Sequence, residues 1–296
     1  MNTNFDSSAN HYIGRFAPSP TGPLHLGSLV SALGSWADAK HHNGTWLVRI
    51  EDIDPQRETP EASQSIIETL QAHHLFADGD ISFQHDHSSR YEEALNQLRQ
   101  QHKLYACTCT RKSLRALNQS NYPGTCRALN YSEDDRALRV VTDDRDIVFE
   151  DLVHGSIAEN LSDSVGDFIV RRRGPFYAYQ LAVVADDAAQ GITHVVRGSD
   201  LLDNTARQIA LQRLLGYANP QYLHLPLATH DDGRKLSKQT GATGLDNAKA
   251  LDNLRAAWRH LGQTPPQRAL NTCEEFLEHC RASWSRALIP VAGKTV

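Results

Sequence analysis

Hydrophobic residues along the chain follow two spacings, one typical of strands and one typical of helices. Clusters of β-branched and apolar residues bounded by Gly and Pro predict strands, and apolar positions that recur every three to four residues predict helices. Up to residue 102, strands are expected at 12–17 and 45–50, and helices at 26–40, 61–74 and 88–102. This alternation is typical of an α/β protein with a parallel sheet.

The alternation is interrupted between residues 104 and 174, where the pattern supports only short strands, at 139–142 and 147–152. It then returns with a helix at 177–189, a strand at 193–197 and a helix at 203–216. Two further helices are expected near the end of the sequence, at 248–261 and 272–287. The pattern thus divides the chain into a flexible tail (1–11), an α/β domain (12–103 and 175–230), an inserted subdomain (104–174) and a loop with a short helical part (231–296).

Composition narrows the classes of protein that fit. The chain has 296 residues, 40% of them hydrophobic and 22% charged, so it can build a core and is not expected to be disordered. No apolar run approaches 18 residues and the first residues lack a basic and apolar leader, so neither a membrane span nor a secretory signal is expected. The net charge of −5 disfavours nucleic-acid binding by bulk electrostatics, although a local basic face remains compatible with it.

The five cysteines favour a reducing compartment, because their number is odd and no export signal is seen. Cys273 and Cys280 are two helical turns apart and are expected to be small buried residues. The other three, Cys107, Cys109 and Cys126, fall within twenty residues, which is the clustering of a metal site. Zinc takes four ligands, so a fourth must come from elsewhere. The nearby candidates are Tyr122, His102 and water.

The segment RFAPSPTGPLHLGS at 15–28 carries the strongest sign of chemistry. Its prolines stiffen a turn after a strand, and Gly22 allows the turn to bend. His25 and Gly27 then fall at the start of a helix, where unpaired N–H groups and the helix dipole favour an anion such as a phosphate. Neither a P-loop nor a dinucleotide-binding GxGxxG sequence is found.

Four segments in order resemble the motifs of glutamyl-tRNA synthetases, which are class I aminoacyl-tRNA synthetases. Residues 15–28 resemble their HIGH-motif region, and RIEDID at 49–54 with Arg57 resembles their RIEDTD segment. VRGSDLL at 196–202 resembles their VIRGxDHL stretch, and KLSKQ at 235–239 resembles their KMSKS loop. The resemblance covers roughly residues 12–245. It implies a Rossmann-like catalytic domain in which an amino acid attacks the α-phosphate of ATP.

The resemblance also implies roles for individual residues. His25, Lys238 and Lys235 would act on the phosphates, and His25, Gly27 and Lys238 would bind ATP, which brings Mg²⁺ with it. A glutamate site needs cations for two carboxylates and an anion for one ammonium, which Arg15, Arg197 and Glu51 supply. The full set of glutamate-binding residues implied by the resemblance is Arg15, Phe16, Ala17, Pro18, Ser19, Glu51, Tyr179 and Arg197.

The cysteine cluster resembles that of a subgroup of short glutamyl-tRNA synthetase paralogues. These have C-x-C, a loop and then Y-x₃-C, with the tyrosine oxygen as a zinc ligand. The resemblance therefore implies one structural zinc on Cys107, Cys109, Tyr122 and Cys126.

Only about fifty residues follow the KLSKQ loop, too few for the helical anticodon-binding domain of a full glutamyl-tRNA synthetase. The chain is therefore expected to resemble the glutamyl-Q tRNA(Asp) synthetases. That family activates L-glutamate with ATP without tRNA and transfers glutamate to queuosine, at the wobble position of tRNA(Asp). We expect a cytoplasmic monomer. The other interpretations are a truncated synthetase that charges the 3′ end of tRNA, a catalytically silent tRNA-binding paralogue, and a class I nucleotidyltransferase that acts on another substrate.

Overall fold

A mostly parallel sheet of seven strands forms the centre of the computed structural model, which describes residues 11–115, 121–227 and 243–291. The expected tail therefore lies almost wholly outside the described residues. The strand order is β3-β2-β1-β9-β10-β6-β7. The strands are β1 (Ile13–Phe16), β2 (Thr45–Ile50), β3 (Ser82–Phe83), β6 (Asp146–Asp151), β7 (Gly155–Asn160), β9 (His194–Gly198) and β10 (Gln221–Leu225).

The order of the parallel strands reverses between β1 and β9, which are neighbours although about 180 residues separate them. β2 and β3 extend the sheet on one side of this point, and β10 extends it on the other. In an open α/β sheet the crevice at such a reversal, outside the carboxyl ends of the strands, is the usual place for a ligand. Arg15 and Phe16 end β1 there, and Arg197 and Gly198 end β9.

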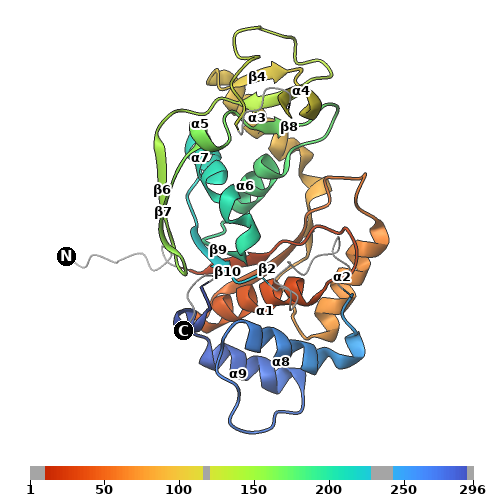
Figure 1. The fold of residues 1–296 in the computed structure, drawn as a ribbon. Coiled ribbons are helices and arrows are strands. Elements are labelled where there is room, and N and C mark those ends of the chain that lie inside the picture. Colours follow the sequence, from red (N-terminus) through yellow and green to blue (C-terminus); the bar gives the residue numbers. More distant parts are fainter. Residues whose placement is uncertain (1–10, 116–120, 228–242, 292–296) are drawn as a thin grey trace, which may run out of the picture.

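Helices cover both faces of the sheet (Figure 1). One face packs against α1 (Leu26–His41), α2 (Pro60–Ala72) and the helices near the C-terminus. The other face packs against α3 (Ser88–Gln100), α6 (Tyr179–Ala189) and α7 (Thr205–Leu215). The two resulting cores are separate clusters of buried side chains, with Leu29 and Trp46 in the first and Leu95 and Leu181 in the second. The structure therefore confirms the expected α/β class.

A small antiparallel sheet lies at one end of the molecule, at the top of Figure 1. It consists of β4 (Leu104–Cys107), β5 (Ala137–Val140) and β8 (Ile169–Arg171), with α4 (Arg111–Arg115) and α5 (Leu161–Ser164) nearby. The β6–β7 hairpin comes from the same stretch of chain, yet β6 pairs with β10 of the large sheet. The segment 104–174 therefore supplies both a separate small sheet and one edge of the large one.

The helices α8 (Ala250–His260) and α9 (Cys273–Ser283) lie beneath α1 in Figure 1. Trp258, Phe276 and Trp284 belong to the same buried cluster as Leu29 of α1. Asp38 of α1, which is fully buried, accepts hydrogen bonds from the Trp284 indole (2.8 Å) and the Arg286 guanidinium (2.7 Å). This helical part is thus fastened to the α/β body by a shared core and a buried ion pair.

Some expected boundaries were wrong by a few residues. α6 begins at Tyr179 rather than 177, because Tyr177 forms a β-bridge with Arg171. α7 begins at Thr205 because residues 199–204 form a 3₁₀ turn, η2 (Ser199–Asn204). Two more 3₁₀ turns, η4 (Asn247–Lys249) and η5 (Arg286–Leu288), flank the last helices, and η1 (Gln84–His87) precedes α3. Local turns with i→i+3 bonds are common at helix ends.

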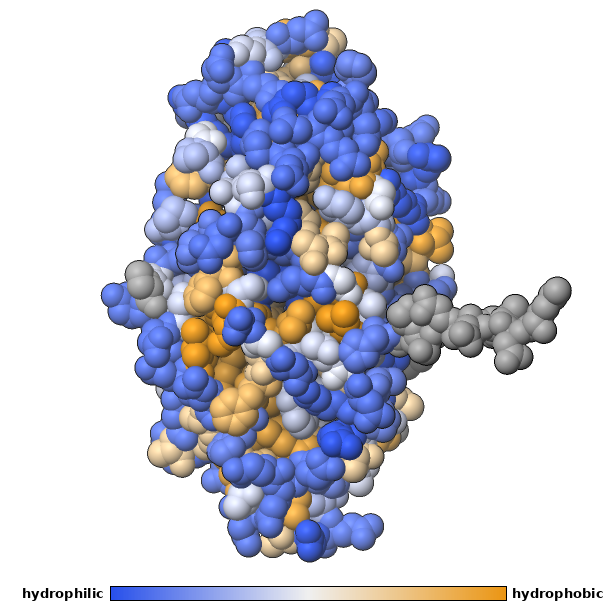
Figure 2. Space-filling model, turned by 180° about the vertical axis from the view of Figure 1, so that it is seen from behind, coloured by the Kyte–Doolittle hydropathy of each residue, from blue (hydrophilic) through white to orange (hydrophobic). Residues whose placement is uncertain are grey.

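The surface seen from behind is hydrophilic over the end that carries the small sheet, and hydrophobic residues gather across the middle (Figure 2). Within the described residues, no helix has the length and apolar character that crossing a bilayer requires.

Candidate functional site

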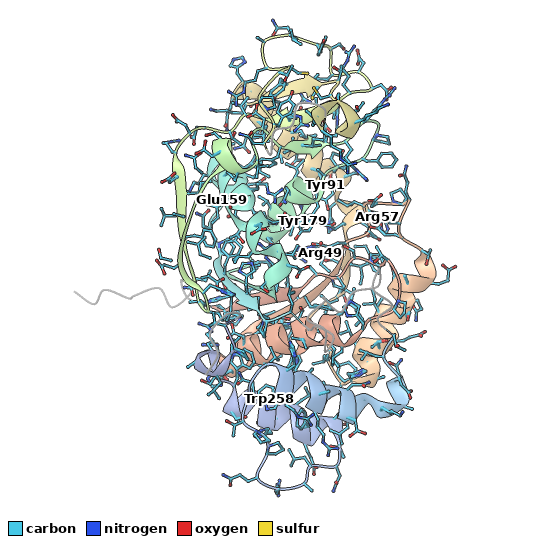
Figure 3. All side chains as sticks on the ribbon, in the orientation of Figure 1. Arg49, Arg57, Tyr91, Glu159, Tyr179 and Trp258 are labelled. Carbon is cyan, nitrogen blue, oxygen red and sulfur yellow. The ribbon has the colours of Figure 1, made fainter. Side chains whose placement is uncertain are left out.

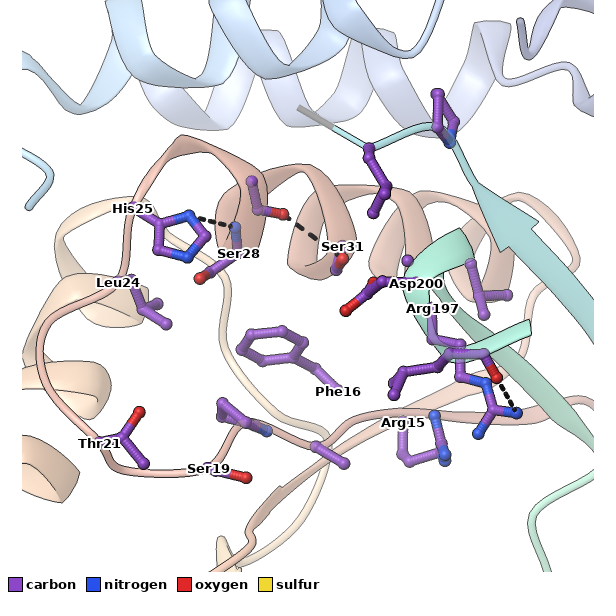
Figure 4. Close-up of a pocket in the computed structure, with 18 of the residues that line it drawn as sticks. Arg15, Phe16, Ser19, Thr21, Leu24, His25, Ser28, Ser31, Arg197 and Asp200 are labelled. Carbon is purple, nitrogen blue, oxygen red and sulfur yellow. Dashed lines mark hydrogen bonds between the residues drawn. The ribbon is translucent and has the colours of Figure 1, made fainter. Parts of the chain in front are cut away.

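A cavity of about 580 Å³ opens at the carboxyl ends of β1 and β9 (Figure 4). Its walls come from the end of β1 with the turn that follows, the start of α1, the start of α6, the end of β9 with η2, and the residues after β10. The residues that line it include Arg15, Phe16, Ala17, Pro18, Ser19, His25, Gly27, Ser28, Tyr179, Arg197 and Asp200. Segments almost 180 residues apart in the sequence therefore meet at one site.

The start of α1 presents His25 to this cavity (Figure 4). His25 is the N-cap residue, and its Nδ1 accepts a hydrogen bond of 3.2 Å from the backbone N–H of Ser28. A neutral imidazole whose Nδ1 accepts carries its proton on Nε2, so the ring can donate from Nε2. Gly27, the second residue of α1, lines the same wall without a side chain. This helix start is therefore suited to a phosphate group.

Arg15 is buried, with 3% of its surface exposed, and a carboxylate on α6 holds it in place. Its Nε and Nη2 donate to Asp187 Oδ1 and Oδ2 at 3.0 and 3.3 Å. Arg49, fully buried on β2, also donates to Asp187 Oδ1, at 2.8 Å. Burial opposes ionisation of Asp187, but the two arginines outweigh it and keep its pKa below the ordinary value. The geometry leaves Arg15 Nη1, which these bonds do not use, for a ligand.

Glu51 lies at the end of β2 beside the same group of charges and is 5% exposed. Arg49 Nη2 donates to Glu51 Oε1 at 3.3 Å. Burial raises the pKa of Glu51 to about 7, since removal from water penalises the carboxylate more than Arg49 and Arg15 stabilise it. A positively charged group of a ligand placed against Glu51 would lower its pKa and favour the ionised carboxylate. Burial and the charge of Glu51 raise the pKa of Tyr179, so its hydroxyl keeps its proton and can donate.

Arg197, on β9, is 5% exposed and is held by four protein acceptors. Its Nε donates to His224 Nε2 (3.0 Å) and its Nη1 to Gln208 Oε1 (2.7 Å). Its Nη2 donates to the Leu201 carbonyl (3.3 Å) and to Thr205 Oγ1 (3.0 Å). A guanidinium has five N–H groups, so one N–H on Nη1 has no acceptor among the described residues. Arg15 and Arg197 therefore present fixed N–H donors to one cavity.

A second cavity of about 500 Å³ adjoins the first, and the two share Ala17, Ser19, Tyr179 and Leu201 among their lining residues. Glu51 lines this second cavity rather than the first. Figure 3 places Tyr179 in the middle of the molecule, between the small sheet and the C-terminal helices. The buried charged residues can thus be reached from either of the two cavities.

Two buried acceptors line the second cavity without hydrogen-bond partners among the described residues: Asp54 Oδ1 and Gln84 Oε1. The other carboxylate oxygen of Asp54 accepts from Arg57 Nε (2.6 Å) and Arg172 Nη1 (3.2 Å). A ligand that brings hydroxyl or amine donors would satisfy the unpaired oxygens.

The cysteine cluster lies where β4 ends, in the small sheet at the top of Figure 1. The sulfur atoms of Cys107, Cys109 and Cys126 all lie within 4.8 Å of one another. Tyr122 Oη is 3.4 Å from Cys107 Sγ and 3.8 Å from Cys109 Sγ. The structure therefore brings together all four residues that the sequence pattern selected.

Comparisons with known proteins identify the family. A model of the catalytic domain of class I tRNA synthetases (E and Q) matches residues 13–263. A glutamyl-Q tRNA(Asp) synthetase of Pseudomonas fluorescens is 47% identical over 285 residues, which are 96% of this chain and 95% of that one. One from Burkholderia cenocepacia is 48% identical over 95% of this chain and 99% of its own length. The chain belongs to the glutamyl-Q tRNA(Asp) synthetase family. It is therefore a ligase of the aminoacyl-tRNA synthetase type.

Solved structures agree on the fold of this synthetase. A glutamate tRNA ligase from Elizabethkingia meningosepticum superimposes with a TM-score of 0.77 at 24% identity. The alignment covers 95% of this chain and 66% of that longer one. At this identity the likeness shows the class I synthetase fold alone.

The sequence-predicted site residues of the synthetase fall into three groups. Arg15, Phe16, Ala17, Pro18, Ser19, Tyr179 and Arg197 line the first cavity together with His25 and Gly27. Glu51 lines the second cavity. Lys235 and Lys238 lie outside the described residues. The roles assigned to all of these residues remain predictions.

Sequence reasoning missed the residues that position the arginines of the synthetase. Asp187, Gln208 and His224 are all buried partners of Arg15 or Arg197. A signal for Asp187 was available, because Asp186 and Asp187 interrupt an apolar helix. No comparable signal marks His224 on its strand. Two arginines of the run at 171–173 also have carboxylate partners, Arg172 with Asp54 and Arg173 with Asp135.

The ionisation of Glu51 can be measured directly. In a ¹³C NMR titration of carboxyl groups without ligands, we expect the Glu51 side chain to titrate with a midpoint near 7 because of its burial. Comparison with the Glu51→Gln variant assigns the signal. Addition of L-glutamate should move the midpoint downward, since an ammonium beside the carboxylate favours its ionised form. A midpoint near the ordinary value of a glutamate would show that Arg49 and Arg15 already neutralise it.

Proposed function

We propose that the chain activates L-glutamate with ATP, without tRNA, and then transfers glutamate to the queuosine base at the wobble position of tRNA(Asp). The observation that carries the proposal is the set of charges at the two cavities: fixed donors of Arg15 and Arg197 on one side and Glu51 beside them. This set matches the two carboxylates and one ammonium of glutamate. The acceptor, tRNA(Asp), is inferred from the names of the relatives, whose sequences match nearly the whole chain.

In the first step the α-carboxylate oxygen of glutamate attacks the α-phosphorus of ATP, and the bond to pyrophosphate breaks. Arg15 and Arg197 would bind the two carboxylates, and Glu51 the ammonium. Tyr179 would donate its hydroxyl hydrogen, and the turn of Phe16, Ala17, Pro18 and Ser19 would form the wall against the substrate. Because the arginines are already held by protein acceptors, little reorganisation is needed when glutamate binds.

The phosphates would lie against the start of α1. His25 can donate from Nε2 to a phosphate oxygen, and Gly27 lets ATP approach the backbone. Lys238 and Lys235 would bring positive charge from the other side, an assignment that rests on the KLSKQ motif. Mg²⁺ would arrive bound to ATP and offset charge on the phosphates. Together these groups stabilise the charge that develops as pyrophosphate leaves.

In the second step a hydroxyl of the queuosine cyclopentenediol attacks the acyl carbon of glutamyl-adenylate, and AMP leaves. The second cavity suits this acceptor because it adjoins the first and contains the unpaired acceptor oxygens of Asp54 and Gln84. A diol supplies two hydroxyl donors. We assign the helical part within 231–296, which follows the KLSKQ motif, to contact with the tRNA stem. The substrates also imply that the chain works in the cytoplasm, and we propose that it does so as a monomer.

We also propose that Cys107, Cys109, Tyr122 and Cys126 hold one structural zinc ion. Tetrahedral ligands at zinc–sulfur distances of about 2.3 Å lie about 3.8 Å apart for two sulfurs and about 3.5 Å apart for a sulfur and an oxygen. The sulfurs of Cys109 and Cys126 are 3.6 Å apart, and Tyr122 Oη lies 3.4 and 3.8 Å from two of the sulfurs. The donor set therefore fits zinc in both chemistry and spacing.

The surroundings of the cluster fit anionic ligands. Arg139 donates from Nε to Cys107 Sγ at 3.2 Å, and its guanidinium lies 3.7 Å from the centre of the Tyr122 ring. Gly166 has a positive φ of 69°, and a Cβ there would meet the Tyr122 carbonyl at 2.0 Å. The backbone of Tyr122 therefore packs so closely against position 166 that only glycine fits there. Such a site would join the end of β4 to the middle of the loop between β4 and β5.

The transfer can be tested with ¹⁴C-glutamate, ATP and two forms of tRNA(Asp), one with queuosine and one with guanosine at the wobble position. We expect label only on the queuosine form, within the ribonuclease fragment that contains the anticodon, since only queuosine carries the attacking diol. Pyrophosphate exchange should occur with glutamate and no tRNA. Label in the 3′-terminal fragment would instead support a synthetase that charges the 3′ end.

Two lysine variants test whether Lys238 takes part in the activation of glutamate. Lys238→Ala should lose pyrophosphate exchange far more than glutamate binding, because it acts on phosphate charge. Lys249→Ala, an exposed residue beside Asp246, should keep both. Equal losses of exchange and binding in Lys238→Ala would contradict the role of Lys238.

Zinc content provides a separate test. Purified protein should contain one zinc per chain by elemental analysis, and Cys126→Ser should lose it because only two thiolates would remain. Cys273→Ser, a buried cysteine of α9, is the matched control and should keep its zinc. Tyr122→Phe should bind zinc more weakly than the wild type. Unchanged zinc affinity in Tyr122→Phe would show that the phenol oxygen is not a ligand.

A further inference from the structure

Arg197 is buried and held by four protein acceptors, and the residues around it form a chain of buried polar groups. His224 on β10 is fully buried, and its Nε2 accepts from Arg197 Nε at 3.0 Å. On the other side of the ring, Nδ1 lies 2.7 Å from Oδ2 of Asp151, which is 3% exposed and ends β6. Thr205 Oγ1, which also accepts from Arg197, lies 3.3 Å from His224 Nε2.

These contacts determine which tautomer His224 adopts. An arginine can only donate, so Nε2 must be the acceptor and the proton must be on Nδ1. That proton is directed at Asp151 Oδ2, whose carboxylate can only accept. An imidazolium would place an N–H against the N–H of Arg197, which is unfavourable. Burial keeps His224 neutral, since it lowers the pKa of the imidazole in spite of Asp151.

Asp151 is itself fixed by the turn that follows β6. Its Oδ1 accepts from the backbone N–H groups of Val153 (3.0 Å) and His154 (2.9 Å). Oδ2 is therefore directed at His224 and cannot exchange roles with Oδ1. The result is one continuous series of hydrogen bonds from the β6–β7 turn, through Asp151 and His224, to the guanidinium of Arg197.

We propose that His224 and Asp151 are positioning residues that fix the orientation of Arg197 for the substrate carboxylate. This inference rests on the proposed glutamate site, and it makes the β6–β7 hairpin part of the binding machinery. The same logic holds wherever a carboxylate sets the tautomer of a histidine that orients a third group. Neither residue touches the substrate cavity itself, so both act through Arg197.

The substitution Asp151→Asn tests the tautomer without changing the shape of the side chain. The asparagine carbonyl would still accept hydrogen bonds from the backbone N–H groups of Val153 and His154. Its NH₂ group would then face His224 Nδ1. Nδ1 would then have to accept, and the proton would move to Nε2, against the N–H of Arg197. We expect the KM for glutamate in pyrophosphate exchange to rise on the order of 10- to 100-fold, as for the loss of a hydrogen bond to a charged group. The kcat and the KM for ATP should change little, since the lost interaction is made equally in the ground and transition states.

Two variants of His224 separate positioning from packing. His224→Gln can place an amide oxygen near the position of Nε2 and should restore most glutamate binding. His224→Asn places its amide near Nδ1, loses the acceptor for Arg197 and should resemble Asp151→Asn. Asp167→Asn changes a buried carboxylate beside the small sheet and should leave the KM for glutamate unchanged. Thermal unfolding of each variant shows whether it is folded.

The tautomer can be read independently of activity. Long-range ¹H–¹⁵N correlation spectra of the wild type should show His224 protonated on Nδ1, and those of Asp151→Asn should show it protonated on Nε2. The His224→Gln spectrum assigns the signals. Protonation on Nε2 in the wild type, an unchanged glutamate KM in Asp151→Asn, or equal losses in His224→Gln and His224→Asn would overturn the inference. A wild type that exchanges no pyrophosphate with glutamate would overturn the proposed function instead, with the spectra still deciding the tautomer.

Discussion

The site depends on the need to pair three arginines that the fold removes from water. Arg15, Arg49 and Arg197 are each 5% exposed or less. An unpaired charge at such depth costs several kcal/mol, and removing one partner of a buried pair costs about 3–5 kcal/mol. Asp187 therefore serves two of these arginines, and His224 with Asp151 serves the third. The same bonds that make burial tolerable also fix the directions of the donors that remain.

The topology of the sheet explains why these groups meet. The strand order reverses between β1 and β9, so the ends of these two strands form the walls of one crevice. α6 precedes β9 in the sequence and contributes Asp187, which accepts a hydrogen bond from Arg15. The β6–β7 hairpin adds an edge to the sheet beside β10 and places Asp151 next to His224. The inserted segment thus reaches the site through the sheet as well as through the small antiparallel subdomain.

The sequence predicted the residues that face the ligand better than those behind them. Arg15, His25 and Arg197 stand in short motifs whose spacing can be read directly, and all three line one cavity. The partner of Arg15 is 172 residues away, and the carboxylate beside His224 is 73 residues away. Such pairs depend on which strands become neighbours, and a single sequence does not state this. The membership of β6 in the large sheet was missed for the same reason.

Local turns limited the prediction of element ends in a different way. α6 begins two residues late because the backbone of Tyr177 pairs with Arg171, a contact made across the small sheet. The cysteine cluster was easier to predict than the ends of the helices. Cys107, Cys109 and Cys126 are close in sequence, and only Tyr122 had to be chosen among several candidates. Chemistry carried by short segments is therefore readable from the sequence, whereas chemistry assembled across the sheet is not.

A crystal structure with L-glutamate bound tests the central claim, that the buried ion pairs hold the arginines ready before the substrate arrives. We expect the two carboxylates of glutamate to lie roughly 3 Å from nitrogens of Arg15 and Arg197. We also expect the guanidinium atoms to shift by no more than about 0.5 Å and to keep their bonds to Asp187 and His224. Glutamate bound elsewhere, or arginines that leave Asp187 and His224 to reach it, would show that the buried ion pairs do not hold the arginines ready for the substrate.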